Sequence, residues 1–200
     1  MHVGILVFDE MELLDMAGPY EVFTTASRVW ARTQPAGCAP LFEVSTLASA
    51  RAPVRARAGL RVQPDHTLAR HPPLACAVVP GGVVDAELGR PDVLAWITAQ
   101  RRQAAVLASV CTGALLLAQA GVLDGLAATT HWEDLDALRA LRPGVTVREA
   151  VRWVDEGPVV TSAGISAGID MSLHLVRRLH GHDLAARTAR QMDYDWNDTP

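Results

Sequence analysis

Three short, uninterrupted apolar runs constrain the fold of this chain more than any other feature of its sequence. They cover residues 3–8, 75–79 and 105–110, and turn-forming residues border each of them. A strand that is apolar on both faces has to be covered on both faces, as happens in a parallel sheet flanked by helices. A further run at 41–47 alternates between apolar and polar residues and predicts another strand.

Helical segments are predicted between and after these strands, over residues 19–29, 91–103, 112–120, 132–141 and 167–180. Pro19 and Pro91 open two of them, at positions where a missing N–H costs nothing. Gly121 and Gly181 follow two others, at positions typical of helix C-caps. Strands that alternate with helices predict βαβ units. We therefore expect an α/β fold with a mostly parallel central sheet and helices on both faces.

Two hairpins are predicted to be added to that core. One joins residues 151–155 to residues 158–162, and a smaller one involves residues 60–62. No repeat, linker or low-complexity tract divides the 200 residues, so a single domain spanning 1–200 is expected. The glycine pattern of dinucleotide-binding folds is missing from the first strand–helix turn. No nucleotide cofactor is therefore predicted, and no cofactor of any other kind.

Composition excludes several classes of partner. The net charge is −4 and the basic residues are scattered, so nucleic acid binding is not expected. Three cysteines without a secretory signal favour free thiols in the cytoplasm. The uncharged stretch 104–123 contains polar residues and changes character halfway, so we do not predict a membrane span. The seven histidines lack the spacing of a zinc site, and no metal is predicted.

Cys111 stands at the junction between an apolar strand and an apolar helix. Gly113, two residues later, permits a tight reversal at this point. A sharp strand-to-helix turn holds one side chain out at the carboxyl edge of the sheet, which is where open α/β sheets bind their ligands. The helix that follows directs its free N–H groups towards the sulfur and is expected to favour the thiolate. Cys111 is therefore predicted to be a functional thiol, whereas Cys76, within a strand, is predicted to be structural.

A nucleophile needs polar partners, and two segments offer them. Gly81 and Gly82 directly follow the strand at 75–79, where their N–H groups could approach a substrate closely. Asp15 lies among apolar residues before the helix predicted at 19–29, so its carboxyl group is expected to be desolvated and held protonated. Its neighbour Glu12 is predicted to be solvated.

The order and spacing of several segments resemble those of the ThiJ/PfpI superfamily, which is related to class I glutamine amidotransferase domains. The matching pieces span nearly the whole chain, at residues 3–8, 14–23, 79–82, 109–113, 129–132 and 164–170. Within the superfamily the sequence is most similar to the isocyanide hydratase branch. The same pieces occur in the sensor-like domain of some AraC-type regulators. The resemblance implies a flavodoxin-like sandwich and a homodimer.

The resemblance also implies roles for individual residues. Cys111 would be the nucleophile, Asp15 the nearby acid and Thr112 the threonine that follows the nucleophile in the hydratases. Peptidase-like members have a histidine where this chain has Thr112, which argues against proteolysis. His131 occupies a place where several members carry a histidine near the thiol, although it could equally cap a helix. Asp170 is expected to anchor the last long helix rather than to touch substrate.

The leading hypothesis is a lyase that adds water to an isocyanide and gives an N-substituted formamide. Cys111 would attack the terminal carbon, Asp15 would supply a proton, and water positioned by Asp15 or Thr112 would complete the reaction. N–H groups around Gly82 and Thr112 would hold the polar end of the adduct. Two alternatives stay open: a small-molecule or oxidant sensor, and a stress-related thiol protein acting on aldehyde adducts. All three require a small-molecule partner.

Overall fold

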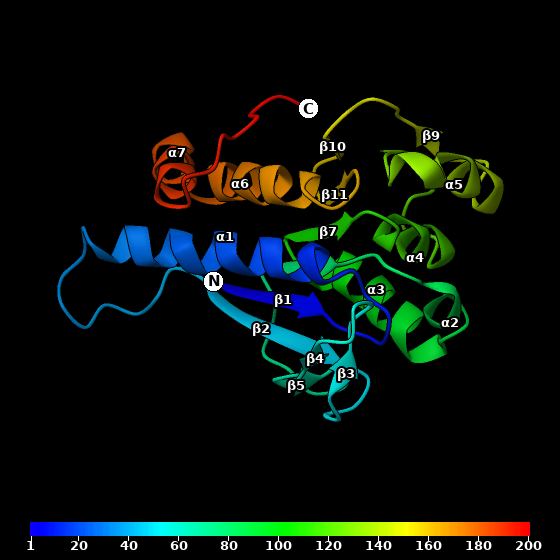
Figure 1. The fold of residues 1–200 in the computed structure, drawn as a ribbon, viewed down its shortest axis with the longest axis horizontal. Helices are drawn as coiled ribbons and strands as arrows, with labels where there is room; N and C mark the ends of the chain where they lie inside the picture. Colours follow the sequence, from blue (N-terminus) through cyan, green and yellow to red (C-terminus); the bar gives the residue numbers. More distant parts are fainter.

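The computed structural model describes residues 1–200, and a seven-stranded sheet runs through its centre (Figure 1). The strands in spatial order are β10 (Trp153–Asp155), β11 (Val159–Ser162), β7 (Val106–Val110), β6 (Cys76–Val79), β1 (His2–Leu6), β2 (Glu43–Ala48) and β5 (His66–Thr67). Every neighbouring pair is parallel except β10 with β11. The predicted strands are all present, and the sheet is mostly parallel as expected.

The topology confirms the flavodoxin-like prediction. The long parallel strands follow the chain as β1, β2, β6, β7 and β11, and they lie in space as β2, β1, β6, β7 and β11. This second-first-third-fourth-fifth order is that of flavodoxin-like sheets. The order reverses between β1 and β6. In such sheets ligands bind beyond the carboxyl ends of the strands at this reversal, so the loops after β1 and β6 lie at the expected position of a site.

Helices cover both faces of the sheet, as predicted. On one face α1 (Leu13–Ala31) packs beside α6 (Ala167–His180) and α7 (His182–Gln191) (Figure 1). On the other face α3 (Pro91–Gln103) and α4 (Gly113–Gln119) contact β7. Three shorter elements extend that side beyond the carboxyl end of the sheet: α2 (Asp85–Leu88), the 3₁₀ helix η1 (Trp132–Asp134) and α5 (Leu135–Leu141).

Both predicted hairpins are present. The larger one is the antiparallel pair β10–β11, of which β11 joins the parallel sheet through β7. The smaller one pairs β3 (Val54–Arg55) with β4 (Arg61–Val62). A separate two-stranded parallel ladder joins β8 (Ala127–Ala128) to β9 (Thr146–Val147).

The predicted start of the first helix was wrong. Helix α1 begins at Leu13, six residues before Pro19, with Glu12 in an extended conformation at the N-cap. Pro19 lies inside this helix, where it cannot donate a hydrogen bond to the carbonyl of Asp15. Asp15 consequently lies in the first turn of a helix and not in a loop. The prediction also missed α7, which a glycine with a φ of 102° separates from α6.

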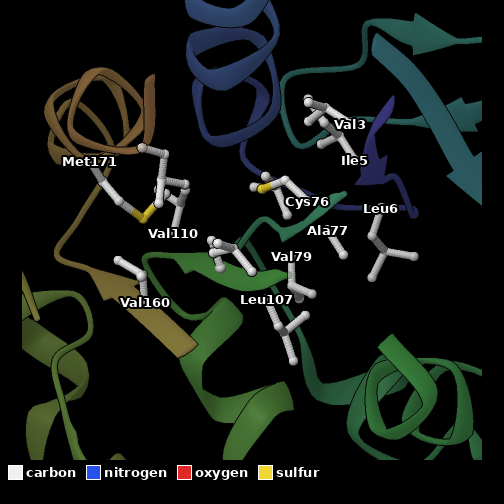
Figure 2. Close-up of a cluster of buried hydrophobic side chains, with 14 of the residues drawn as sticks. Val3, Ile5, Leu6, Cys76, Ala77, Val79, Leu107, Val110, Val160 and Met171 are labelled. Carbon is white, nitrogen blue, oxygen red and sulfur yellow. The ribbon is translucent and has the colours of Figure 1, made fainter. Parts of the chain in front are cut away.

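The core lies between the two helical layers and the sheet. Figure 2 shows Cys76 of β6 among these apolar side chains, together with Met171 of α6 and Val110 of β7, and all three are buried. The uncharged stretch 104–123 divides into a central strand and a short helix. None of the helices combines the length and the apolar character that crossing a bilayer requires.

Candidate active site

Cys111 occupies a strained turn directly after β7. Its φ of 55° is in the left-handed region, which costs a non-glycine residue free energy. Several hydrogen bonds hold the turn in place. The Cys111 N–H is shared between the carbonyls of Ser162 (3.2 Å) and Ala163 (3.3 Å), and its own carbonyl accepts the Thr130 hydroxyl at 2.8 Å. The predicted elbow is therefore present, and β11 and the segment after β8 anchor it.

Two backbone segments meet under this elbow so closely that only glycine fits between them. A Cβ on Gly81 would lie 2.5 Å from the backbone nitrogen of Thr112, and a Cβ on Gly113 would lie 2.2 Å from the carbonyl oxygen of Val79. Real Cβ contacts are not this short, so an alanine at either position would force the loops apart. These glycines allow the loop after β6 to lie directly against the start of α4.

Thr112 links the same two segments through its hydroxyl. The Oγ1 atom accepts the Gly82 N–H at 2.8 Å and donates to the Gly82 carbonyl at 2.9 Å. The hydroxyl and the N–H thus already satisfy each other within the protein. In this arrangement the Gly82 N–H does not point freely at a ligand, which differs from the predicted role of holding an adduct. Thr112 instead fixes the position of the loop that borders the thiol.

Asp15 lies beneath the elbow and is completely buried. One carboxylate oxygen accepts the Gly81 N–H at 2.9 Å, and the other has no conventional partner. Burial raises the pKa of Asp15 to about 7; the Gly81 N–H opposes this, the charge of Glu12 adds to it, and a weak hydrogen bond with the Cys111 thiol lowers it slightly. The expected desolvation is confirmed. Near neutral pH the group is poised between its two protonation states, so it can both accept and donate a proton.

The thiol of Cys111 differs from the prediction in its ionisation. Burial raises its pKa to about 12 and the Asp15 carboxylate adds to this, while backbone hydrogen bonds from Thr112 and Ile165 lower it. The N–H of Thr112 at the start of the following helix lowers the pKa as predicted, but the expected net preference for the thiolate was wrong because burial outweighs it. Helix α4 has only seven residues, and its N-terminus does not compensate for the loss of solvent around the sulfur. The resting cysteine is a thiol and needs a base to become nucleophilic.

A pocket of 520 Å³ opens above the sulfur. Its wall contains Gly82, Cys111, Thr112 and His131, and an apolar side is formed by Val83, Val84, Leu88, Leu115, Ala137, Leu141 and Ile165. Four of the six residues predicted from the sequence therefore line one cavity. The other two, Asp15 and Gly81, lie behind this wall, in contact with each other and with the residues of the elbow. The volume suits a small organic molecule.

His131 serves two purposes. Its Nδ1 accepts the Glu133 N–H at 3.4 Å and so caps η1, while its ring packs against Gly164, where a Cβ would lie 2.1 Å from the imidazole. The same residue lines both the pocket above Cys111 and a second pocket of 500 Å³.

Sequence reasoning missed several residues of this site. Glu12, predicted to be solvated, lines the pocket, and Arg57 lies 3.8 Å from its carboxylate. Ile165, with a φ of 44°, brings a backbone hydrogen bond to the sulfur. The sequence carried no local signal for these contacts, because three separate loops create them. Asp170 matches the prediction: it is buried away from the pocket and pairs with Arg152 and with the backbone N–H of Asn197.

No group of three or more histidine, cysteine, aspartate or glutamate side chains is arranged to hold a metal ion. The chemistry that the arrangement offers is that of a thiol with an adjacent carboxyl group. Both groups are desolvated, and the carboxyl group titrates near neutral pH.

Known proteins are similar to this chain in sequence and in fold. Residues 1–178 match the DJ-1/PfpI family. The isonitrile hydratase of Pseudomonas putida is 34% identical over 97% of this chain and 78% of its own length. The HTH-type transcriptional regulator GbdR of Pseudomonas aeruginosa is 32% identical over 96% of this chain, which spans half of the regulator. A crystal structure of a ThiJ/PfpI family protein from Pseudomonas syringae superposes with a TM-score of 0.84 at 29% identity, covering 98% of this chain and 76% of that one. The chain belongs to the DJ-1/PfpI family.

Proposed function

We propose that this protein is a hydratase that converts an isocyanide, also called an isonitrile, into an N-substituted formamide. One observation carries the proposal: a strained cysteine lines a pocket sized for a small molecule, and a buried carboxyl group that titrates near pH 7 lies directly behind it. The similarity to the P. putida isonitrile hydratase over 97% of this chain supports the same reaction class.

The first step forms a carbon–sulfur bond. Because the Cys111 thiol is protonated at rest, the Asp15 carboxylate accepts its proton while the sulfur attacks the terminal carbon of R–N≡C. Asp15 then delivers that proton to the same carbon. The product is the thioimidate R–N=CH–S–Cys111, and the Asp15 carboxylate is regenerated.

The second step adds water to the C=N bond. Asp15 removes a proton from the water as the water oxygen attacks the carbon, and it delivers this proton to the substrate nitrogen. The tetrahedral adduct R–NH–CH(OH)–S–Cys111 then collapses, the carbon–sulfur bond breaks, and the sulfur recovers its proton through Asp15. The sum is one isocyanide and one water converted into R–NH–CHO.

The direct test is to incubate purified protein with a short panel of alkyl and aryl isocyanides and to follow formamide by NMR or chromatography. We expect conversion by the wild-type protein and none by Cys111→Ala. A wild-type protein that leaves every isocyanide of the panel unchanged contradicts the proposal.

A second candidate function is that of a small-molecule or oxidant sensor. The similarity of nearly the whole chain to half of GbdR, a transcriptional regulator, favours it. A sensor would bind a ligand reversibly in the pocket or undergo oxidation at Cys111, without turnover. Adding dicarbonyl compounds to the panel also tests the third hypothesis, that of a thiol protein acting on aldehyde adducts.

We propose in addition that the chain forms a homodimer, an expectation that follows from the family resemblance. Light scattering should give twice the 21.4 kDa mass of one chain. A monomer at micromolar concentration contradicts it.

A further inference from the structure

The pocket above Cys111 has an uneven distribution of charge. Four carboxylates line it, and they come from three separate places in the chain: the N-cap of α1, the start of α2, and η1. They are Glu12, Asp85, Glu133 and Asp134. The basic residues among the lining are only Arg57 and His131. We call the four carboxylates the acidic rim.

The two basic residues do not neutralise the acidic rim. Arg57 lies 3.8 Å from Glu12 and offsets that carboxylate alone. His131 lies 3.6 Å from Glu133 and 3.5 Å from Asp134. Its Nδ1 also accepts the Glu133 N–H, and a single imidazole can offset at most one of these two carboxylates. Asp85 takes part in none of these pairs.

The carboxylates of the acidic rim affect the pKa values of the two reacting groups. The Asp134 carboxylate is one of the causes that raise the pKa of Cys111, and the Glu12 carboxylate is one of those that raise the pKa of Asp15. A cleft lined by one sign of charge concentrates ligands of the opposite sign and repels those of the same sign.

We infer that the site selects small electrophiles that carry a positively charged group at the end of an apolar body, and that it discriminates against anionic molecules of the same shape. The apolar wall around Leu88, Leu115 and Leu141 would contact the body, and the charged end would lie among Asp85, Glu133 and Asp134 at the mouth. For an isocyanide substrate the inference rests on the proposed function. The preference itself is a property of the pocket and can be tested without turnover.

The first test compares three alkyl isocyanides of equal chain length that end in an ammonium, a methyl or a carboxylate group. At low ionic strength we expect kcat/KM for the ammonium compound to exceed that for the carboxylate compound by roughly tenfold or more, with the neutral compound between them. The ratio should shrink towards one as salt is added, because salt screens charges at the mouth. Equal kcat/KM values at low salt overturn the inference.

The second test does not depend on hydratase activity. Cationic and anionic methanethiosulfonate reagents of similar size are reacted with Cys111 in a Cys38→Ser background, and the labelling rate is followed by mass spectrometry. The cationic reagent should react faster by roughly the same tenfold factor. If no isocyanide is converted but this ratio is found, the proposed function fails and the charge preference stands. If isocyanides are converted but neither ratio departs from one, the proposed function stands and the charge preference fails.

Matched variants locate the effect in the rim. The double variant Glu133→Gln, Asp134→Asn should reduce the cation-to-anion labelling ratio to about threefold or less. Asp134 makes no side-chain capping bond to α5, so the substitution does not remove a cap. The control is Asp136→Asn, which removes an exposed charge on α5 outside the pocket and should leave the ratio unchanged. An equal loss in the control would mean that overall charge and not the rim sets the ratio, and the inference would be wrong.

Discussion

Cys76 and Cys111 belong to neighbouring parallel strands and differ in almost every property that decides reactivity. Cys76 opens β6 and lies wholly within the core between the sheet and the α1–α6 layer (Figure 2), whereas Cys111 follows β7 at the opposite end of the sheet. Burial raises the pKa of both thiols to about 12. Acidity therefore does not distinguish them. What distinguishes Cys111 is a pocket above it and a proton acceptor beside it.

The comparison is sharpest when each cysteine is removed. Cys111→Ala should abolish formamide production, because no other group forms the covalent adduct, while its melting temperature stays close to that of the wild type. Cys76→Ala should keep the turnover rate and lose about 1 kcal/mol of unfolding free energy through the small cavity it leaves. Turnover assays and urea unfolding on both variants check this. Loss of turnover in folded Cys76→Ala would contradict the comparison.

Removing the proton acceptor is the next largest effect. Asp15→Asn keeps the shape of the side chain but cannot accept the thiol proton, so kcat should fall roughly 10²–10⁴-fold. Glu21→Gln, an exposed carboxylate on the same helix, is the control and should match the wild type. Steady-state kinetics on both variants measures this, and full activity in Asp15→Asn would exclude Asp15 as the base.

Alkylation directly tests how accessible each cysteine thiol is to a reagent in solution. Iodoacetamide should modify Cys111 at least roughly 100-fold faster than Cys76, since Cys76 becomes reachable only when the strand opens. The thiol pKa cannot produce this ratio, because burial raises the pKa of both groups to about 12. Peptide mapping over time gives the two rates. Equal labelling of the two cysteines in the wild type would refute the role given to the pocket.

The raised pKa of Asp15 should also make the free energy of unfolding depend on pH. Its folded pKa of about 7 lies above its ordinary value of 3.8, so between these pH values the folded state binds more protons than the unfolded state. Stability therefore falls as the pH rises through this window, by about 4 kcal/mol at most. The difference in unfolding free energy between Asp15→Asn and the wild type should shift in favour of the variant from pH 4 to pH 8. Urea titrations across this range measure it, and a constant difference would mean that the pKa of Asp15 is not raised.

The smallest effect is expected at Thr112. Thr112→Val leaves the Gly82 N–H and carbonyl without their partner, which should cost about 1–3 kcal/mol of stability. Since the hydroxyl is engaged with Gly82 and handles no reacting proton in our scheme, kcat should fall by about tenfold at most. Thermal unfolding and kinetics separate the two losses. A decrease in rate as large as that of Asp15→Asn would mean that Thr112 takes part in proton transfer.

The sequence was sufficient to predict the sheet and the elbow. The apolar runs mark strands covered on both faces, and a cysteine between a strand and a helix must lie at the carboxyl edge of the sheet. It was not sufficient to predict the ionisation of Cys111, because helix polarity is a local property and burial depends on how distant loops pack. The same limit applies to Glu12 and Arg57, whose place in the pocket depends on loops far apart in the chain. Helix α7 was missed because Gly181 was interpreted as the end of the helical region.

The glycine-packed junction beneath Cys111 has a consequence for how this scaffold can change. Segments that touch backbone to backbone accept almost no substitution, whereas the mouth of the pocket consists of exposed side chains such as Val83, Asp85 and Glu133. Surface replacements of this kind usually alter stability by less than about 0.5 kcal/mol. New ligand preferences can therefore accumulate at the mouth while the thiol and its acid stay where they are. A scaffold divided in this way is well suited to become a catalyst in one lineage and a ligand-responsive module in another.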